Sequence, residues 1–184
     1  MNPIYGNADF FFPDKKSNRY MWAPVKEWTL RYVSIQIMCA GRVVLDVGSK
    51  YGFGALFLEN WAKKVIATDI ENKLKVDVPF IQADWTKEVN INEKIDIINC
   101  MEVIEHVKEP EKVIKNCSRV LDKNGVLILT TPCVDRGLPK EVHIKPFFTK
   151  EELKELISPY FEIDFLEKHL NVSWLCIARR KCFG

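Results

Sequence analysis

The stretch from Val43 to Ala55, VVLDVGSKYGFGA, places an acid and three glycines at the end of an apolar run. Glycine adopts backbone conformations that other residues avoid, and it lets a ligand approach the backbone closely. A strand that ends in such a turn and leads into a helix points backbone amides at a polar ligand. The dinucleotide fingerprint G-x-G-x-x-G is incomplete, because Phe57 follows Gly52 and Gly54 where a third glycine is required.

Two further acids follow at the ends of strand-like runs. Asp69 ends VIATD, roughly twenty residues after the glycine turn, where a carboxylate can accept hydrogen bonds from both hydroxyls of a ribose. Asp84 ends FIQAD, and the Trp85 ring beside it is placed to lie flat on a purine. An aspartate after a strand is commonly a turn or helix cap, but Asp46, Asp69 and Asp84 in this order indicate a nucleoside site.

A third polar string, CMEVIEHVKEP, begins at the end of the fourth strand-like run. Ligands and chemistry collect at the carboxyl ends of strands in open α/β sheets, so Glu102, Glu105 and His106 are expected to face the reaction site. His143 follows in EVHIKPFF. Because imidazole groups titrate near neutral pH, His106 and His143 are the candidate general bases, with packing or substrate orientation as their alternative roles.

Apolar runs of strand length, rich in Val, Ile, Leu or Phe, recur along the chain. They cover residues 43–47, 64–69, 78–82, 95–100, 125–131, 160–166 and 172–179. Helical patterns cover residues 24–39, 52–62, 110–121 and 149–157. The connection between the second and third runs is too short for a full crossover helix, and Asn124-Gly125 predicts a tight turn.

This alternation predicts an α/β fold with a mostly parallel sheet, helices on both faces and an antiparallel finish. A chain of 184 residues fits one domain, so we expect residues 1–184 to fold as a unit. Residues 1–40 would cover the ligand side, and residues 41–184 would form the core. The aromatic segment before Pro24 either packs on the body or lies across the ligand mouth.

Composition excludes some partners. A net charge of +2 gives no support for nucleic acid binding, which usually requires a clear basic excess. The six cysteines contain no C-x-x-C pair, which favours reduced thiols in the cytoplasm. The chain shows neither a secretory leader pattern nor an apolar run of membrane-spanning length, so we expect no membrane association.

From Val43 to Arg179 the chain resembles the class I S-adenosylmethionine-dependent methyltransferases. The family motif D-x-G-x-G-x-G, which binds the amino acid part of the cofactor, matches Asp46, Gly48 and Gly52, with Lys50 in place of the middle glycine. The resemblance implies a Rossmann-like, seven-stranded sheet whose last strand is antiparallel. It also implies a ribose contact for Asp69 and an adenine contact for Asp84.

The predicted cofactor site also includes neighbours at the same strand ends. These are Ser49, Lys50, Ile70, Trp85 and Met101. Because a lysine avoids positive φ, Lys50 is interpreted as a solvated residue on a tolerated turn, with pairing to the cofactor carboxylate or a damaged site as alternatives.

The E-V-I-E-H-V string resembles a subset that includes ubiquinone-pathway O-methyltransferases and plant small-RNA 2′-O-methyltransferases. The catalytic candidates are Glu105, His106 and His143. Some relatives hold a divalent cation with equivalents of Glu102, Glu105, His106 and His143, whereas others carry the string without metal. We expect no metal here and treat the four-ligand site as an alternative.

The sequence therefore predicts methyl transfer from S-adenosylmethionine to an oxygen or nitrogen of a small-molecule acceptor. The alternatives are a non-catalytic cofactor-binding or partner subunit and a metal-assisted RNA 2′-O-methyltransferase. The loop at residues 132–146 is the expected place of acceptor selection, since it leaves the carboxyl end of the fifth strand.

Overall fold

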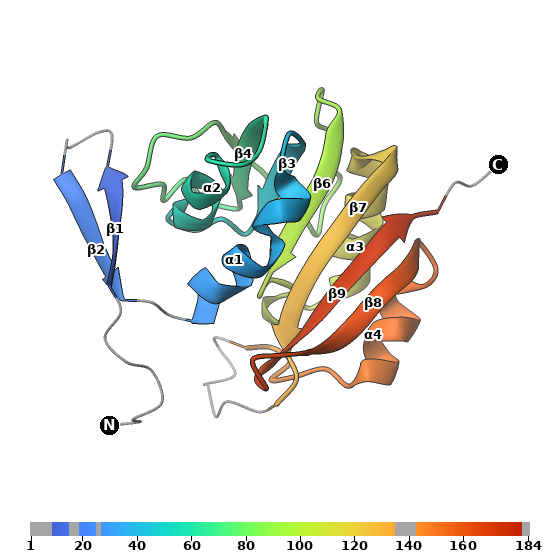
Figure 1. Ribbon diagram of the computed structural model, residues 1–184. Coiled ribbons are helices and arrows are strands. Elements are labelled where there is room, and N and C mark those ends of the chain that lie inside the picture. The colour runs from blue at the N-terminus through green and yellow to red at the C-terminus, as the bar shows by residue number, and fades with distance from the viewer. Residues whose placement is uncertain (1–8, 15–18, 25–26, 135–142, 182–184) are drawn as a thin grey trace.

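A seven-stranded sheet forms the centre of the computed structural model, which describes residues 9–14, 19–24, 27–134 and 143–181 (Figure 1). The strand order is β5-β4-β3-β6-β7-β9-β8. In that order the strands are Phe80–Gln82, Lys64–Asp69, Val43–Val47, Ile95–Met101, Leu121–Pro132, Ser173–Arg180 and Phe161–His169. Strand β9 is antiparallel to β7 and β8, and the other pairs of this sheet are parallel. The predicted sheet is confirmed.

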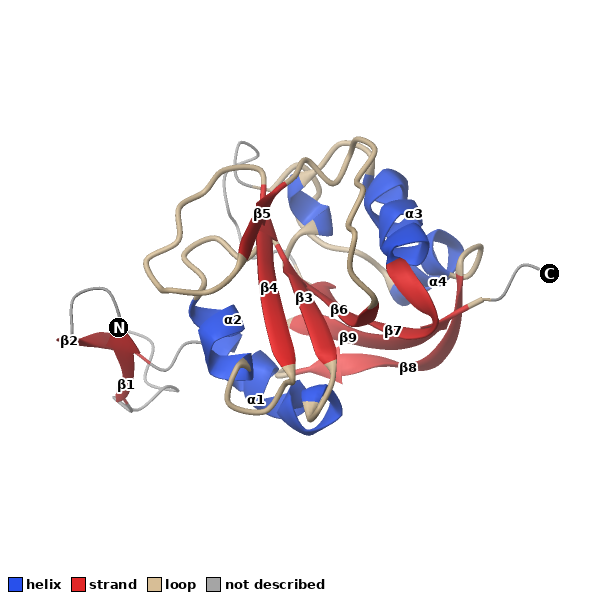
Figure 2. Cartoon of the chain, turned by 90° about the horizontal axis from the view of Figure 1, so that it is seen from above, coloured by secondary structure: helices blue, strands red, loops and turns tan. Residues whose placement is uncertain are grey.

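Helices cover both faces of the sheet, and Figure 2 shows α1 and α2 on one side and α3 and α4 on the other. They are α1 (Glu27–Cys39), α2 (Phe53–Leu58), α3 (Pro110–Val120) and α4 (Lys150–Ile157), with a short 3₁₀ turn η1 (Ile104–His106) after β6. Each face buries its own apolar cluster, one around Ile35 and Leu58 and the other around Ile114, Leu153 and Phe161. No helix in the described ranges has the length and apolarity needed to span a bilayer.

The connection from β4 to β5 contains no helix, which confirms the prediction of a short or missing one. This loop is instead fastened to the glycine turn. The Lys75 amide donates to the Tyr51 carbonyl at 3.0 Å. A Cβ added at Gly52 would come within 2.6 Å of the side chains of Leu74 and Val76, so the glycine allows the loop to pack there.

Strand β7 begins four residues earlier than the predicted run at residues 125–131. It begins at Leu121, and the expected turn at Asn124-Gly125 lies within it as an interruption of the register. Leu121 pairs with Ile95, yet Val126 pairs with Ile97, so β7 carries extra residues between two pairs on β6. Asn124-Gly125 therefore bends one strand.

A separate antiparallel hairpin precedes α1, and the sequence patterns did not predict it. Its strands are β1 (Asp9–Asp14) and β2 (Arg19–Pro24), and they stand apart from the main sheet in both views (Figures 1 and 2). Residues 1–8, 15–18 and 25–26 lie outside the described part of the chain. The predicted covering of the ligand side by residues 1–40 and the single-domain organisation stay predictions.

Candidate active site

A cavity of about 390 Å³ opens along the carboxyl ends of four neighbouring parallel strands. Its wall contains Asp84 after β5, Asp69 at the end of β4, Gly48 after β3 and Glu102 after β6. The polar residues therefore follow one another in the order of the strands in the sheet. This is the place where open α/β folds bind ligands.

Six of the ten predicted cofactor residues line this cavity, and the other four lie behind it. The lining residues are Gly48, Lys50, Asp69, Ile70, Asp84 and Trp85. Those behind the wall are Asp46, Ser49, Gly52 and Met101, all buried. Apolar side chains complete the lining, among them Val47, Val103, Val107 and Val113. The cavity thus combines an apolar surface with a few acids, as small-molecule sites usually do.

Three backbone amides join the glycine turn to the end of β4, and a fourth, from Ile70, binds Asp69 locally. Those of Gly48 and Ser49 donate to the Thr68 carbonyl at 2.9 and 3.1 Å. The Lys50 amide donates to Asp69 Oδ2 at 2.8 Å, and the Ile70 amide donates to Asp69 Oδ1 at 2.7 Å. The Asp69 carboxylate is therefore fixed by the backbone at the edge of the cavity.

Lys50 adopts the left-handed conformation that its place in the motif demands, with φ of +49° between Gly48 at +72° and Gly52 at +81°. Its side chain is exposed, and its Nζ lies 5.5 Å from the centroid of the Tyr51 ring. The left-handed conformation costs an ordinary residue about 1 to 2 kcal/mol. Lysine is thus accommodated in this turn, and its ammonium stays in contact with solvent.

Gly48 has a second reason to be glycine. A Cβ at this position would lie 2.5 Å from Val103 Cγ2, a side chain of the segment that follows β6. Contacts this short are not tolerated without movement of the neighbouring group. Gly48 therefore lets the turn after β3 and the segment after β6 meet at the cavity.

Asp84 and Trp85 have local structural roles as well as positions in the wall. Asp84 Oδ1 accepts hydrogen bonds from the Thr86 amide at 3.0 Å and the Thr86 hydroxyl at 2.6 Å, which lower the pKa of the Asp84 carboxyl. Trp85 is only 5% exposed, and its indole N–H donates to Thr68 Oγ1 at 3.2 Å. The indole is therefore largely part of the core beneath the cavity.

Asp46 lies fully buried beneath the glycine turn. Tyr32 of α1 donates to Asp46 Oδ1 at 3.0 Å, and Asn99 Nδ2 donates to the same oxygen at 2.5 Å. Tyr32 can reach this position because residue 54 is glycine, where an added Cβ would lie 2.0 Å from Tyr32 Cζ. Burial raises the pKa of the Asp46 carboxyl to about 7, against the opposing effect of the two hydrogen bonds.

The Glu102 side chain is directed toward α1 rather than toward the other residues of the alternative metal site. Its carboxylate pairs with the buried Arg31 at 3.3 Å and accepts a hydrogen bond from Ser173 Oγ at 3.1 Å. Its backbone is left-handed, with φ of +55°. This position does not favour the four-ligand interpretation of the metal site.

Glu105, His106 and His143 do lie together, with potential ligand atoms within 4.8 Å of one another. Glu105 is fully buried and accepts a hydrogen bond from Thr131 Oγ1 at 3.1 Å. His106 lines the cavity, its ring centroid 4.8 Å from that of the buried His143, and its Nε2 lies 3.9 Å from Glu105 Oε1. The exposed imidazole is thus backed by a buried imidazole and a buried carboxyl group.

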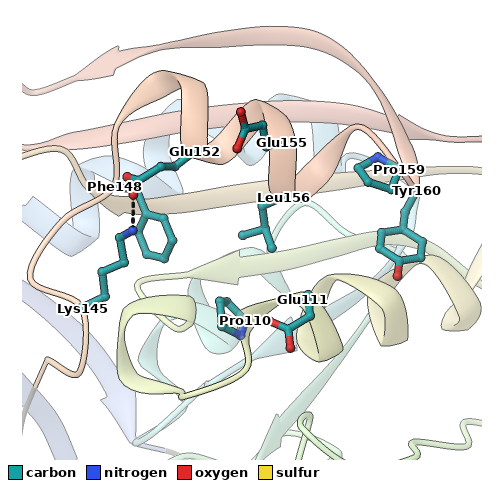
Figure 3. A pocket seen from close by; sticks show the side chains of 9 residues that line it. All are labelled: Pro110, Glu111, Lys145, Phe148, Glu152, Glu155, Leu156, Pro159 and Tyr160. Carbon is teal, nitrogen blue, oxygen red and sulfur yellow. Dashed lines mark hydrogen bonds and ion pairs between the residues drawn. The ribbon is translucent and has the colours of Figure 1, made fainter.

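Lys145 holds the segment that carries His143 in place through two contacts. The Lys145 amide donates to the Glu105 carbonyl at 3.1 Å, and Lys145 Nζ pairs with Glu152 of α4 at 2.5 Å. Figure 3 shows this pair at one end of a second cavity, of about 410 Å³, between α3 and α4. None of the predicted catalytic or cofactor residues lines that cavity. Residues 135–142, most of the predicted acceptor loop, lie outside the described part.

Three residues of this neighbourhood were not identified from the sequence: Arg31, Tyr32 and Asn99. Each is buried or partly buried in a helix or strand. Their partners are distant in the chain, as in the 53-residue separation between Asn99 and Asp46. The only indication in the sequence is a polar residue among apolar ones, and this pattern does not identify the residue's partner.

Replacing Lys50 by glycine should raise the free energy of unfolding by about 0.5 to 1 kcal/mol, because relief of left-handed strain exceeds the added chain entropy. Urea denaturation measures the change. Lys50→Ala is the matched control, since it removes the ammonium but keeps the strain. Equal stabilisation by both variants would contradict the backbone explanation.

Replacing Asp46 by asparagine should change the pH dependence of stability. The pKa of Asp46 is raised from 3.8 to about 7, so the native state binds this proton more tightly than the unfolded chain. The wild type therefore loses stability as pH rises through this interval, and the loss persists above it. The advantage of Asp46→Asn should grow from near zero at acidic pH to on the order of a few kcal/mol at pH ~8.

Urea titrations at several pH values test this, with the exposed Asp77→Asn as the control. A difference between Asp46→Asn and wild type that is constant across the pH range would exclude the assigned proton.

Comparison with known proteins places this geometry in a family. Residues 10–171 match the family model described as a methyltransferase domain. A ubiquinone biosynthesis O-methyltransferase of Coxiella burnetii is 33% identical over 115 residues, covering 55% of this chain and 48% of that protein. A probable S-adenosylmethionine-dependent methyltransferase of Mycobacterium tuberculosis is 28% identical over 145 residues, covering 74% of this chain and 53% of that protein.

The chain spans about half the length of these two relatives. Among solved structures, the PH0226 protein of Pyrococcus horikoshii superposes with a TM-score of 0.70 at 22% identity, covering 84% of this chain and 89% of that one. This similarity concerns the fold. The family match over most of the chain shows that the chain belongs to the class I S-adenosylmethionine-dependent methyltransferase family.

Proposed function

We propose that this protein binds S-adenosylmethionine across the four strand ends and transfers its methyl group to an oxygen or nitrogen of a small-molecule acceptor. The observation that carries the proposal is the order of Asp84, Asp69, Gly48 and Glu102 along one cavity. Two relatives that share the sequence pattern are named as methyltransferases, one of them as S-adenosylmethionine-dependent.

The order of the acids along the cavity favours one direction for the cofactor. The adenine would lie at the β5 end near Asp84, and the ribose hydroxyls would donate to Asp69, whose two oxygens retain acceptor capacity beyond their backbone partners. The amino acid part would then lie near Gly48 and the end of β6. Because Gly48 carries no side chain, its backbone can come into contact with the ligand.

The sulfonium of the bound cofactor supplies an electrophilic methyl group, so the protein has to place the acceptor in line and exclude water. His106 is the imidazole on the cavity wall that can accept the proton of an acceptor hydroxyl. His143 and the buried Glu105 stand behind it and orient its ring. An amine acceptor would need no base, provided that it arrives deprotonated.

An apolar, small acceptor suits the walls near His106, where Val103, Val107 and Val113 line the cavity. The net charge of +2 does not favour a nucleic acid acceptor. The five cysteines in the described residues are free thiols, four of them buried, which agrees with a reducing compartment such as the cytoplasm.

Cofactor binding can be tested at the ribose acid. Asp69→Ala should weaken S-adenosylmethionine binding by roughly 1.5 to 3 kcal/mol, the usual loss when hydrogen bonds to a charged group disappear. Isothermal titration calorimetry measures the affinity, with Asp77→Ala in the neighbouring loop as the control. Unchanged affinity in Asp69→Ala would place the cofactor elsewhere.

The chemical step can be tested at the cavity histidine. His106→Gln should lower kcat for a hydroxyl acceptor by about a hundredfold or more and leave cofactor affinity unchanged, because general base catalysis contributes that much to rate. Transfer of a tritiated methyl group to a panel of phenols, catechols and amines provides the assay, with the exposed Lys108→Ala as the control.

Two further outcomes of that assay decide between functions. Cofactor binding without transfer to any acceptor would favour a non-catalytic binding subunit. Loss of activity with a chelator, restored by Mg²⁺ or Mn²⁺, would show a metal-assisted reaction at Glu105, His106 and His143.

A further inference from the structure

Arg31, Glu102 and Ser173 form a network of mutual contacts beside the cofactor cavity. Arg31 Nη2 lies 3.3 Å from Glu102 Oε2 and donates to Ser173 Oγ at 3.0 Å. Ser173 Oγ in turn donates to Glu102 Oε1 at 3.1 Å. The three residues come from α1, the end of β6 and the start of β9, so the network joins elements that are far apart in the sequence.

Two features of Glu102 are energetically unfavourable. Its left-handed backbone, with φ of +55°, is unfavourable for a residue with a side chain. Its ion pair with Arg31 is largely desolvated, with side-chain exposures of 5% for Arg31 and 18% for Glu102. A buried ion pair is seldom more stabilising than apolar residues of similar volume. Strained residues of this kind concentrate at functional sites.

Glu102 also lies at one end of the cavity, opposite Asp84. The strand ends follow the order β5, β4, β3 and β6, with Asp84 at one end and Glu102 at the other. If the adenine lies by Asp84 and the ribose by Asp69, the amino acid part of the cofactor lies nearest Glu102. That part carries an ammonium group, for which a carboxylate is the matching acceptor.

We propose that Arg31 is a positioning residue for cofactor binding: with Ser173 it fixes the Glu102 carboxylate, which accepts a hydrogen bond from the cofactor ammonium. This inference rests on the proposed function. Arg31 of α1 balances the charge of Glu102 before the cofactor arrives and contacts Oε2, while Ser173 of β9 donates to Oε1. Glu102 is the more exposed residue of the pair and lines the cavity.

Two ligands separate this role from general damage to the cavity. S-adenosylhomocysteine carries the amino acid part, whereas 5′-methylthioadenosine keeps the adenosine and lacks that part. Glu102→Gln should weaken binding of S-adenosylhomocysteine by about tenfold or more, the size expected for a lost charged hydrogen bond. Binding of 5′-methylthioadenosine should stay within about twofold of the wild type, because its contacts lie at the β4 and β5 ends.

Arg31→Lys and Ser173→Ala should show the same selective loss, at a smaller size. Arg31→Lys removes the planar guanidinium group but keeps the positive charge, so Glu102 is not left without a counter-charge. Ser173→Ala is the milder variant if Arg31→Lys does not fold. Ile37→Ala, on the same helix with a side chain 73% exposed, is the control and should bind both ligands as the wild type does.

A double-mutant cycle tests whether Arg31 acts through Glu102. In the Glu102→Gln background, Arg31→Lys and Ser173→Ala should change S-adenosylhomocysteine affinity by less than about twofold. Additive losses would overturn the proposal, since Arg31 would then act on the ligand directly. An equal loss for both ligands in Glu102→Gln would overturn it as well. Failure of the wild type to bind either ligand would instead remove the proposed function.

Discussion

The parallel pairing of β3 with β4 and β6 is the constraint on which the rest of the structure depends. Val47, the last residue of β3, lies opposite Thr68 of β4 and Cys100 of β6, so the three strands end at the same level. The polar residues that follow them in sequence therefore reach one edge of the sheet. The cavity, the fixed carboxylate of Asp69 and the strained Glu102 all follow from this alignment.

In the glycine turn, backbone hydrogen bonds hold a residue in a left-handed conformation that is intrinsically unfavourable for it. Lys50 is left-handed because its amide is directed to Asp69 and its neighbours Gly48 and Ser49 are bound to the Thr68 carbonyl. These hydrogen bonds offset the strain of the left-handed conformation at Lys50. A departure from a glycine motif is thus compatible with an intact turn when the adjoining strand supplies enough acceptors.

The sequence predicted the sheet, its helices and the acids at the strand ends, because apolar runs and turn residues are local patterns. It missed the β1–β2 hairpin and the register interruption in β7, which depend on pairing between segments. At the site, it predicted roles for Asp69 and His106 from their places after strands, and both line the cavity. It could not find Arg31 or Tyr32, since their partners lie far along the chain. The alternative four-ligand metal site included Glu102, whose carboxylate pairs with Arg31 instead.

The link between Arg31 and Ser173 joins positions 142 residues apart, so it has a consequence for how the chain folds during synthesis. Helix α1 leaves the ribosome well before β9, because β9 follows it in the chain. Until β9 adds to the sheet, the guanidinium group has no Ser173 to bind, and docking of α1 is incomplete. Contacts between distant segments form late and slow folding. The ligand-binding edge is therefore complete only after β9 has joined the sheet.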